Sequence, residues 1–139
     1  MELKLIGRKE KVSFPELGLK NFIAKVDTGA YTSSIHCHGV KVIEQEGVSY
    51  LKALFLDEEN QEQTVLFKDY TQTKVRSSSG VAQTRYLVKT PIRIGAKVYS
   101  ASFTLANRSK MKCPVLLGRK LLNKRFLVDV SQEFALQKS

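Results

Sequence analysis

The feature that most restricts how this chain can fold is a period-two alternation of apolar and polar residues, broken by turns that contain glycine. Residues 40–43 and 48–56 form one pair of such runs, and residues 85–94 and 97–105 form a second pair around Gly95-Ala96. Successive side chains of a β-strand point to opposite faces, so alternating runs joined by a short glycine turn favour antiparallel hairpins. The sequence therefore predicts two β-hairpins.

Shorter apolar and β-branched runs predict further strands outside these hairpins. They are residues 22–26, 63–67, 115–117 and 126–130. The segment 119–124, RKLLNK, instead consists mainly of good helix formers, but it is long enough for only a turn or two of helix. We therefore expect an all-β fold, mostly antiparallel, with one short helix near the C-terminus.

The size of the chain suits one compact core. With 139 residues, 42% of them hydrophobic, it is short for two domains, and no repeat or linker is visible, so we expect a single domain over residues 1–139. No apolar run is long enough for a membrane span, and the first ten residues lack a secretory signal. The expected location is therefore the cytoplasm, without a membrane partner.

The formal net charge of +10, from 23 Lys and Arg against 13 Asp and Glu, would attract a polyanion such as nucleic acid, an anionic membrane or an acidic peptide. The positive charges are spread along the chain, so a solvated basic surface explains them equally well. Binding to RNA would rest on charge alone, because the sequence has no aromatic block of the kind that stacks on bases.

A carboxylate in a Thr-Gly turn, Asp27-Thr28-Gly29, directly follows the predicted strand 22–26. Taken alone, the triplet describes an ordinary turn, because Asp and Gly are common turn residues and Gly29 permits a tight bend. A second motif, Leu116-Leu117-Gly118-Arg119, combines an apolar strand with a Gly-Arg pair that opens the predicted helix.

Together the two motifs resemble the retropepsin-like aspartic peptidases, in which an apolar strand leads into D-T-G-A and an apolar-apolar-Gly-Arg segment follows later. The match is closer to one bacterial branch, often labelled an ATP-dependent zinc protease. Some of its members are associated with the ATP-grasp ligase that adds glutamates to a ribosomal protein. The closer resemblance is carried, over about residues 20–131, by the blocks 25–30, 32–36, 76–80, 83–85, 107–111, 114–119 and 126–130.

The residues of this chain support neither the zinc nor the ATP dependence that the label states. The sequence has no H-E-x-x-H motif, which binds zinc from one face of a helix. It also has no glycine-rich Lys-Ser/Thr loop to hold the phosphates of ATP. We therefore expect no cofactor.

The resemblance implies a closed retropepsin-like β-barrel and an aspartic-type endopeptidase with Asp27 as its catalytic residue. Such enzymes need two carboxylates that share a proton, and this chain has one D-T-G, so a homodimer would pair two copies of Asp27. The family association and the basic charge make acidic or poly-glutamate peptide tails a plausible substrate. A non-catalytic peptide- or ribosome-binding module on the same fold is the alternative.

Residues around Asp27 and in a second loop are candidates for binding the substrate. The loop at 76–85 is small, polar and glycine-containing, and its two arginines could bind substrate carboxylates or remain solvated. The candidate substrate-binding residues are Thr28, Gly29, Ala30, Arg76, Ser79, Gly80 and Arg85. The residues expected to support the site structurally are Gly118, Arg119 and His36.

The run His36-Cys37-His38 contains three side chains that can bind a metal. In a strand the two histidines would share one face and the cysteine would point to the other, which leaves too few ligands for a tetrahedral zinc site. Cys113 could join, but nothing in the sequence indicates it. We therefore expect no metal, a packing role for His36, and two reduced cysteines in ordinary core or surface positions.

Overall fold

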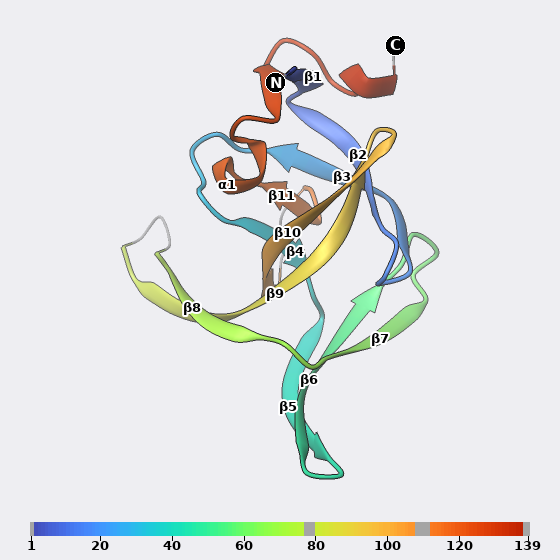
Figure 1. Cartoon of the computed structure of the whole chain (residues 1–139), viewed down its shortest axis with the longest axis vertical. Coiled ribbons are helices and arrows are strands. Elements are labelled where there is room, and N and C mark those ends of the chain that lie inside the picture. Colours follow the sequence, from blue (N-terminus) through green and yellow to red (C-terminus); the bar gives the residue numbers. More distant parts are fainter. Residues whose placement is uncertain (1, 77–79, 108–111, 138–139) are drawn as a thin grey trace.

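The structure, a computed structural model, describes residues 2–76, 80–107 and 112–137. Within these ranges the chain forms mostly β-strands joined by short turns, with one four-residue α-helix near the C-terminus (Figure 1). The predicted all-β fold with one short helix is confirmed. No helix in these ranges is long and apolar enough to cross a membrane.

The strands and helices follow one another along the chain from the N-terminus to the C-terminus. They are β1 (Lys4–Gly7), β2 (Lys9–Phe14), β3 (Leu19–Val26), β4 (Ser33–His36), β5 (Gly39–Gln45), β6 (Val48–Leu56), β7 (Glu62–Phe67), β8 (Thr71–Arg76), β9 (Ala82–Ile94), β10 (Lys97–Ala106), β11 (Val115–Leu117), α1 (Arg119–Leu122), β12 (Phe126–Asp129) and a final 3₁₀ turn, η1 (Ala135–Gln137).

The predicted closed barrel is confirmed, and six strands form it. Their order is β10-β4-β11-β3-β2-β9, and the barrel closes because β9 and β10 also pair with each other. The outer strand β8 pairs with β9, and together they form a long arm that leaves the barrel on one side (Figure 1). Of the segment 76–85 that the sequence analysis proposed as a loop facing the substrate, Arg76 ends β8 and residues 82–85 belong to β9.

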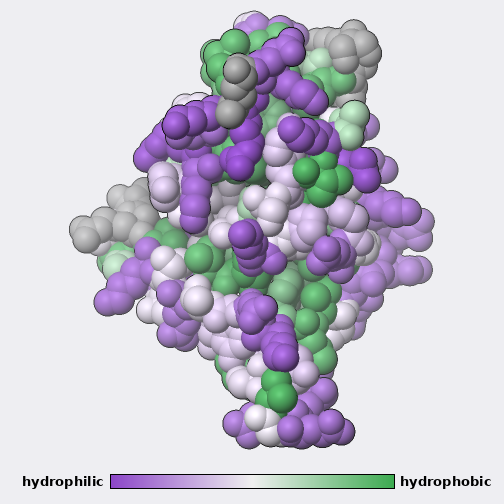
Figure 2. Space-filling view, in the orientation of Figure 1, coloured by the Kyte–Doolittle hydropathy of each residue, from purple (hydrophilic) through white to green (hydrophobic). Residues whose placement is uncertain are grey.

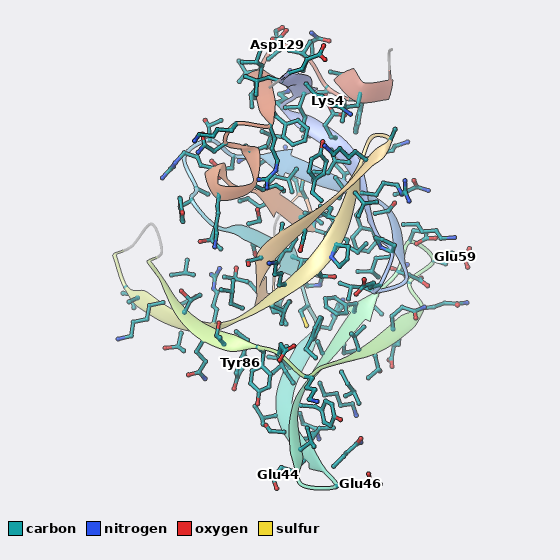
Figure 3. The ribbon with its side chains drawn as sticks, in the orientation of Figure 1. Lys4, Glu44, Glu46, Glu59, Tyr86 and Asp129 are labelled. Atoms are coloured by element: carbon teal, nitrogen blue, oxygen red, sulfur yellow. The ribbon has the colours of Figure 1, made fainter. Side chains whose placement is uncertain are left out.

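Two smaller sheets lie at opposite ends of the molecule. β1 pairs in parallel with β12 near the two termini, while β5, β6 and β7 form an antiparallel sheet at the other end (Figure 1). The labelled side chains in Figure 3 mark these ends: Lys4 and Asp129 lie at the first, and Glu44 and Glu46 lie at the tip of the β5–β6 hairpin.

Both predicted hairpins are present. β5 and β6 pair in register from Gly39↔Leu54 to Gln45↔Val48, and β9 and β10 pair around the turn at Gly95. Gly47 and Gly95 have φ angles of 79° and 65°, in the left-handed region that glycine adopts at little cost. The turn glycines therefore fix the hairpin register that the alternation of residues requires.

The alternate apolar residues of the barrel strands form its core. Phe14 and Phe103 are fully buried and meet edge to face, with ring centroids 5.3 Å apart. Cys37 and Cys113 form no disulfide, and both are buried. Burial raises the pKa of the Cys37 thiol, although bonds to two backbone carbonyls partly offset that effect.

Candidate active site

The loop that follows β3 holds the carboxylate of Asp27 in a defined position. The Asp27 N–H donates to the carbonyl of Leu117 at 2.9 Å, which ties the start of the loop to β11. The Gly29 N–H donates to Asp27 Oδ1 at 2.9 Å, and the Ala30 N–H donates to the Asp27 carbonyl at 3.2 Å. This local turn leaves Asp27 partly exposed, with a carboxylate whose orientation is fixed by the backbone.

The segment from β11 into α1 packs against this loop at very short range. A Cβ on Gly118 would lie 2.7 Å from the carbonyl oxygen of Tyr31, which is closer than real Cβ contacts allow. The Gly118 N–H donates to Ser33 Oγ at 3.0 Å, and the Arg119 N–H donates to the Ala30 carbonyl at 2.8 Å. The backbone at Gly118 therefore lies in close contact with residues 30–33, and this contact joins the two motifs.

Arg119 adds a side-chain contact to the same loop. Its Nη1 donates to the Thr28 carbonyl at 3.0 Å, and its guanidinium lies 5.8 Å from the centre of the Tyr31 ring. Arg119 is largely exposed and points along the loop backbone. These contacts join Arg119 to the backbone and the Tyr31 ring of the Asp27 loop.

A cleft of about 900 Å³ opens beside Asp27, between the loop and the β8–β9 arm. Its lining residues come from strands and loops that are far apart in sequence. They are Asp27, Gly29, Ala30, Tyr31, Thr32, Ser34, Thr73, Lys74, Val75, Arg85, Leu87, Ser102, Thr104, Leu116 and Lys120. Of these described lining residues Asp27 is the only acidic one, while Lys74, Arg85 and Lys120 are basic.

The cations of the cleft have no acidic partners in the described part of the chain. The salt bridges found there join Arg8 and Lys9 to Glu133, at the other side of the fold. Arg85 donates to Gln83 Oε1 at 3.2 Å, and this acceptor is a neutral side chain on its own strand. The cleft therefore combines one carboxylate with several uncompensated positive charges.

The structure brings some of the predicted site residues together and places others elsewhere. Gly29, Ala30 and Arg85 line the cleft with Asp27, whereas Thr28 lines a neighbouring groove of about 750 Å³. Gly80 lies near the tip of the arm, where its φ of +84° suits glycine. Arg76 is the last residue of β8, and Ser79, like the predicted block at 108–111, lies outside the described residues.

His36 lies at the end of β4 that points away from Asp27 and is not among the residues that line the cleft. Its Nε2 is 3.1 Å from His38 Nε2, and the two rings meet edge to face. β4 ends at His36 and β5 begins at Gly39, so the buried Cys37 and His38 lie in the connection between the two strands. Among the described residues, no group of three or more His, Cys, Asp or Glu side chains is arranged to hold a metal.

Other aspartates of the chain are engaged in local turns. Ser131 and Gln132 donate to the Asp129 carboxylate, and these hydrogen bonds lower its pKa to about 2. Asp57 accepts bonds from Gln61 and Glu59, which also lower its pKa. Figure 3 shows Asp129, like Glu44, Glu46 and Glu59, at the periphery of the molecule. None of them is placed to share a proton with Asp27 of the same chain.

The sequence analysis did not assign a binding role to the cleft residues Lys74, Lys120, Ser34, Thr104 and Leu116, although Leu116 belongs to the second motif and Ser34 to the block 32–36. Their common property is their position in the register of neighbouring strands, which no local motif records. An alternating pattern predicts which side chains share a face of one strand, but it does not predict which strands become neighbours.

Comparisons with known proteins agree with this architecture. The model of the family described as RimB-like, retropepsin-like aspartic endopeptidase RimB, matches residues 5–139. A crystal structure of a Legionella pneumophila protein of unknown function superimposes with a TM-score of 0.79 and 27% sequence identity, covering 97% of this chain and 99% of that one.

Two curated relatives carry the name probable alpha-L-glutamate ligase. One, from Desulfotalea psychrophila, is 33% identical over 136 residues, and one from Shewanella pealeana is 33% identical over 135 residues. The matches cover 96% and 95% of this chain but 29% and 30% of the relatives, so the chain spans less than a third of their length. With the family model matching nearly the whole sequence, the chain belongs to the RimB-like family of retropepsin-like aspartic endopeptidases.

Proposed function

We propose that this protein is an aspartic-type endopeptidase of the cytoplasm and that Asp27 is its catalytic residue. The observation that carries the proposal is the position of the Asp27 carboxylate. It is held by the Gly29 N–H and by the β11–α1 segment, and it opens into a cleft large enough for an extended peptide. The other described residues that line this cleft supply no second acid, so Asp27 carries the acid–base chemistry.

Hydrolysis of a peptide by carboxylates alone requires two of them. One, ionised, removes a proton from the attacking water, while the other, protonated, donates a hydrogen bond to the scissile carbonyl. Two close carboxylates share one proton, because ionising both is costly. In a two-fold homodimer the same residue of each copy meets at the axis, so two copies of Asp27 complete the pair.

An apolar surface next to the Asp27 loop supports a homodimer. The groove of about 750 Å³ runs from Thr28 and Tyr31 to Leu3 and Val128. Its apolar lining is accompanied by the basic residues Arg119, Lys120 and Lys124. Beyond it, Leu5 and Leu127 are cross-strand neighbours in the β1–β12 sheet and are 47% and 55% exposed. Figure 2 shows apolar side chains at this end of the molecule. A second copy that covered this surface would bury it and bring the two Asp27 loops toward one axis.

The proposed substrate is an acidic peptide tail, such as a chain of glutamates. Lys74, Arg85 and Lys120 line the cleft without acidic partners in the described residues, and the chain carries a net charge of +10. The curated relatives are named for glutamate ligation, and a peptidase of glutamate tails would act on the product of such a reaction. Charge complementarity favours association with acidic peptides over basic ones.

Replacing Asp27 with asparagine tests the proposal. The amide oxygen of the new side chain can still accept the bond from the Gly29 N–H, so the fold is expected to persist. Because the amide can neither remove nor donate the catalytic proton, cleavage of a peptide ending in several glutamates should fall by about a hundredfold or more. The exposed Asp69 provides the matched control, and Asp69→Asn should cleave normally. Full activity of Asp27→Asn would refute the assignment.

The alternative is a non-catalytic module that binds acidic peptides or the ribosome. It is favoured by one observation, the single carboxylate in the cleft of the described chain. Sedimentation of the protein together with the cleavage assay separates the two functions. A protein that remains monomeric and binds the glutamate peptide without cutting it would be such a module.

A further inference from the structure

The floor of the cleft is crossed by a row of four side chains from neighbouring strands. In the strand register, Leu87 of β9 is paired with Thr104 of β10, Thr104 with Ser34 of β4, and Ser34 with Leu116 of β11. All four line the cleft. The hydroxyl groups of Thr104 and Ser34 therefore lie between Leu87 and Leu116. Leu116 belongs to β11, which pairs with β3, the strand that leads into Asp27.

The hydroxyl of Ser34 is buried and has no hydrogen-bond partner in the described structure. Ser34 is 5% exposed, and its Oγ is one of two buried side-chain oxygens without a partner among the described residues. Its neighbours differ from it, because Ser33 Oγ accepts from the Gly118 N–H, and Thr104 Oγ1 donates to the Ser33 carbonyl at 3.4 Å. A buried hydroxyl without a partner is costly, so the Ser34 side chain regains that energy when it turns toward the cleft and bonds to a group that has entered it.

The surroundings of Ser34 define what that group is. Leu87 and Leu116 flank the two hydroxyls with apolar surface, which suits the methylene groups of a ligand. Lys74 and Arg85 line the same cleft, and their charge favours an anionic end. A side chain with an apolar stem and a terminal carboxylate satisfies both requirements, and among the amino acids glutamate has that form.

We propose that Ser34 is the substrate-binding residue of a subsite that receives one glutamate side chain of the peptide next to Asp27. The Ser34 hydroxyl donates a hydrogen bond to the glutamate carboxylate, and Leu87 and Leu116 contact its methylene groups. This inference rests on the proposed function, because it assigns a selective contact to the same cleft. It adds a specificity residue that neither sequence motif contains.

Binding of synthetic peptides to the Asp27→Asn protein tests the subsite without cleavage. The probes are an all-glutamate peptide and a series in which one glutamate at a time is replaced by glutamine or alanine. In the Asp27→Asn protein, one position should stand out as the most sensitive to replacement. Adding Ser34→Ala should weaken binding of the all-glutamate peptide roughly ten- to hundredfold and remove that sensitivity.

Thr90→Val is the matched control. Thr90 has the other buried oxygen without a partner among the described residues, is 3% exposed, and does not line the cleft. Both substitutions remove a hydroxyl that forms no bond in the free protein, so neither should lower the unfolding temperature. Thr90→Val should bind every peptide as the parent does. If the Ser34→Ala protein stays folded but binds the glutamate peptide more weakly, the loss is due to the missing hydrogen bond from Ser34 to the peptide.

The outcomes separate this inference from the proposed function. The subsite is overturned if adding Ser34→Ala leaves peptide binding unchanged, or if the Asp27→Asn protein binds no peptide. Either result overturns it even when Asp27→Asn abolishes cleavage. Cleavage that survives in Asp27→Asn overturns the proposed function, whereas loss of glutamate selectivity in Ser34→Ala would still support the subsite. Equal losses in Ser34→Ala and Thr90→Val would also overturn it, since the effect would not depend on the cleft.

Discussion

The side chain of Glu10 is fully buried, although carboxylates are rarely buried unless their charge is matched by donors. It accepts hydrogen bonds from the backbone N–H groups of Gly7 at 2.8 Å, Ala135 at 2.9 Å and Leu136 at 3.4 Å. These donors come from β1 and from the C-terminal turn η1, which are distant in sequence. Glu10 thus joins the start of the chain to its end, and the charge strengthens each bond.

Glu10→Ala should strongly destabilise the fold, because one buried and two partly buried N–H groups would lose their acceptor. We expect a loss of about 3 kcal/mol or more, and a smaller loss of about 1–2 kcal/mol for Glu10→Gln, which keeps a neutral acceptor. Denaturant unfolding measures both values. Glu16 is exposed, so Glu16→Gln is the control and should unfold like the parent. A Glu10→Ala protein as stable as the parent would show that the carboxylate does not join the termini.

The sequence predicted Asp27, Gly118 and Arg119 because each belongs to a local motif whose backbone geometry determines its role. It did not predict Ser34 or Glu10. The polar oxygen of a serine and the charge of a glutamate ordinarily indicate surface positions, and only the pairing of distant strands reverses that expectation in this fold. Local chemistry is readable residue by residue, whereas a position set by long-range register is not.

At the scale of elements, the site depends on the close packing of the β11–α1 segment against the Asp27 loop. Three backbone bonds join them, from Asp27 to Leu117, from Arg119 to Ala30 and from Lys120 to Tyr31. The absence of a side chain on Gly118 allows this approach, since the nearest atoms to its missing Cβ belong to the backbone and cannot rotate away. The loop is therefore positioned by a strand that follows it much later in the chain.

Gly118→Ala should push the two segments apart. We expect a loss of about 2–3 kcal/mol in the free energy of unfolding, because backbone must shift to accept the methyl group. Displaced amide resonances of residues 28–32 in NMR spectra would locate the shift. Gly39→Ala is the matched control, because a Cβ there meets nothing within 4 Å. Equal stability of the two variants would contradict the close approach.

The elements that the sequence predicted have a clean alternation, a short apolar run or a cluster of helix formers, and β2 and β8 were missed because they have none of these. β2 carries Glu10 on its inward face, which breaks the apolar period of that strand. β8, with the sequence TQTKVR, belongs to the arm outside the barrel and has little apolar surface to bury. Both strands form because neighbours supply hydrogen-bond partners, a condition that residue patterns along one strand do not express.

At the scale of the whole molecule, the net charge of +10 acts in opposite directions on the two proposed associations, with a peptide and with a second copy. It attracts an acidic peptide, but it repels a second copy of the same chain. The apolar neighbours Leu5 and Leu127 would have to outweigh that repulsion in a homodimer. Salt separates the two effects, because screening weakens charge interactions and leaves apolar contacts intact or stronger.

Raising sodium chloride from about 0.1 M to about 1 M shortens the Debye length from about 10 Å to about 3 Å. The homodimer should then become tighter in sedimentation velocity, while binding of a glutamate peptide to the Asp27→Asn protein should weaken roughly tenfold or more. Replacing Leu5 and Leu127 with serine should reduce the dimer at both salt concentrations without affecting peptide binding by the monomer. If salt dissociated the dimer instead, ion pairs and not the apolar surface of β1 and β12 would hold the two copies together, and the second carboxylate would have to reach Asp27 from another face.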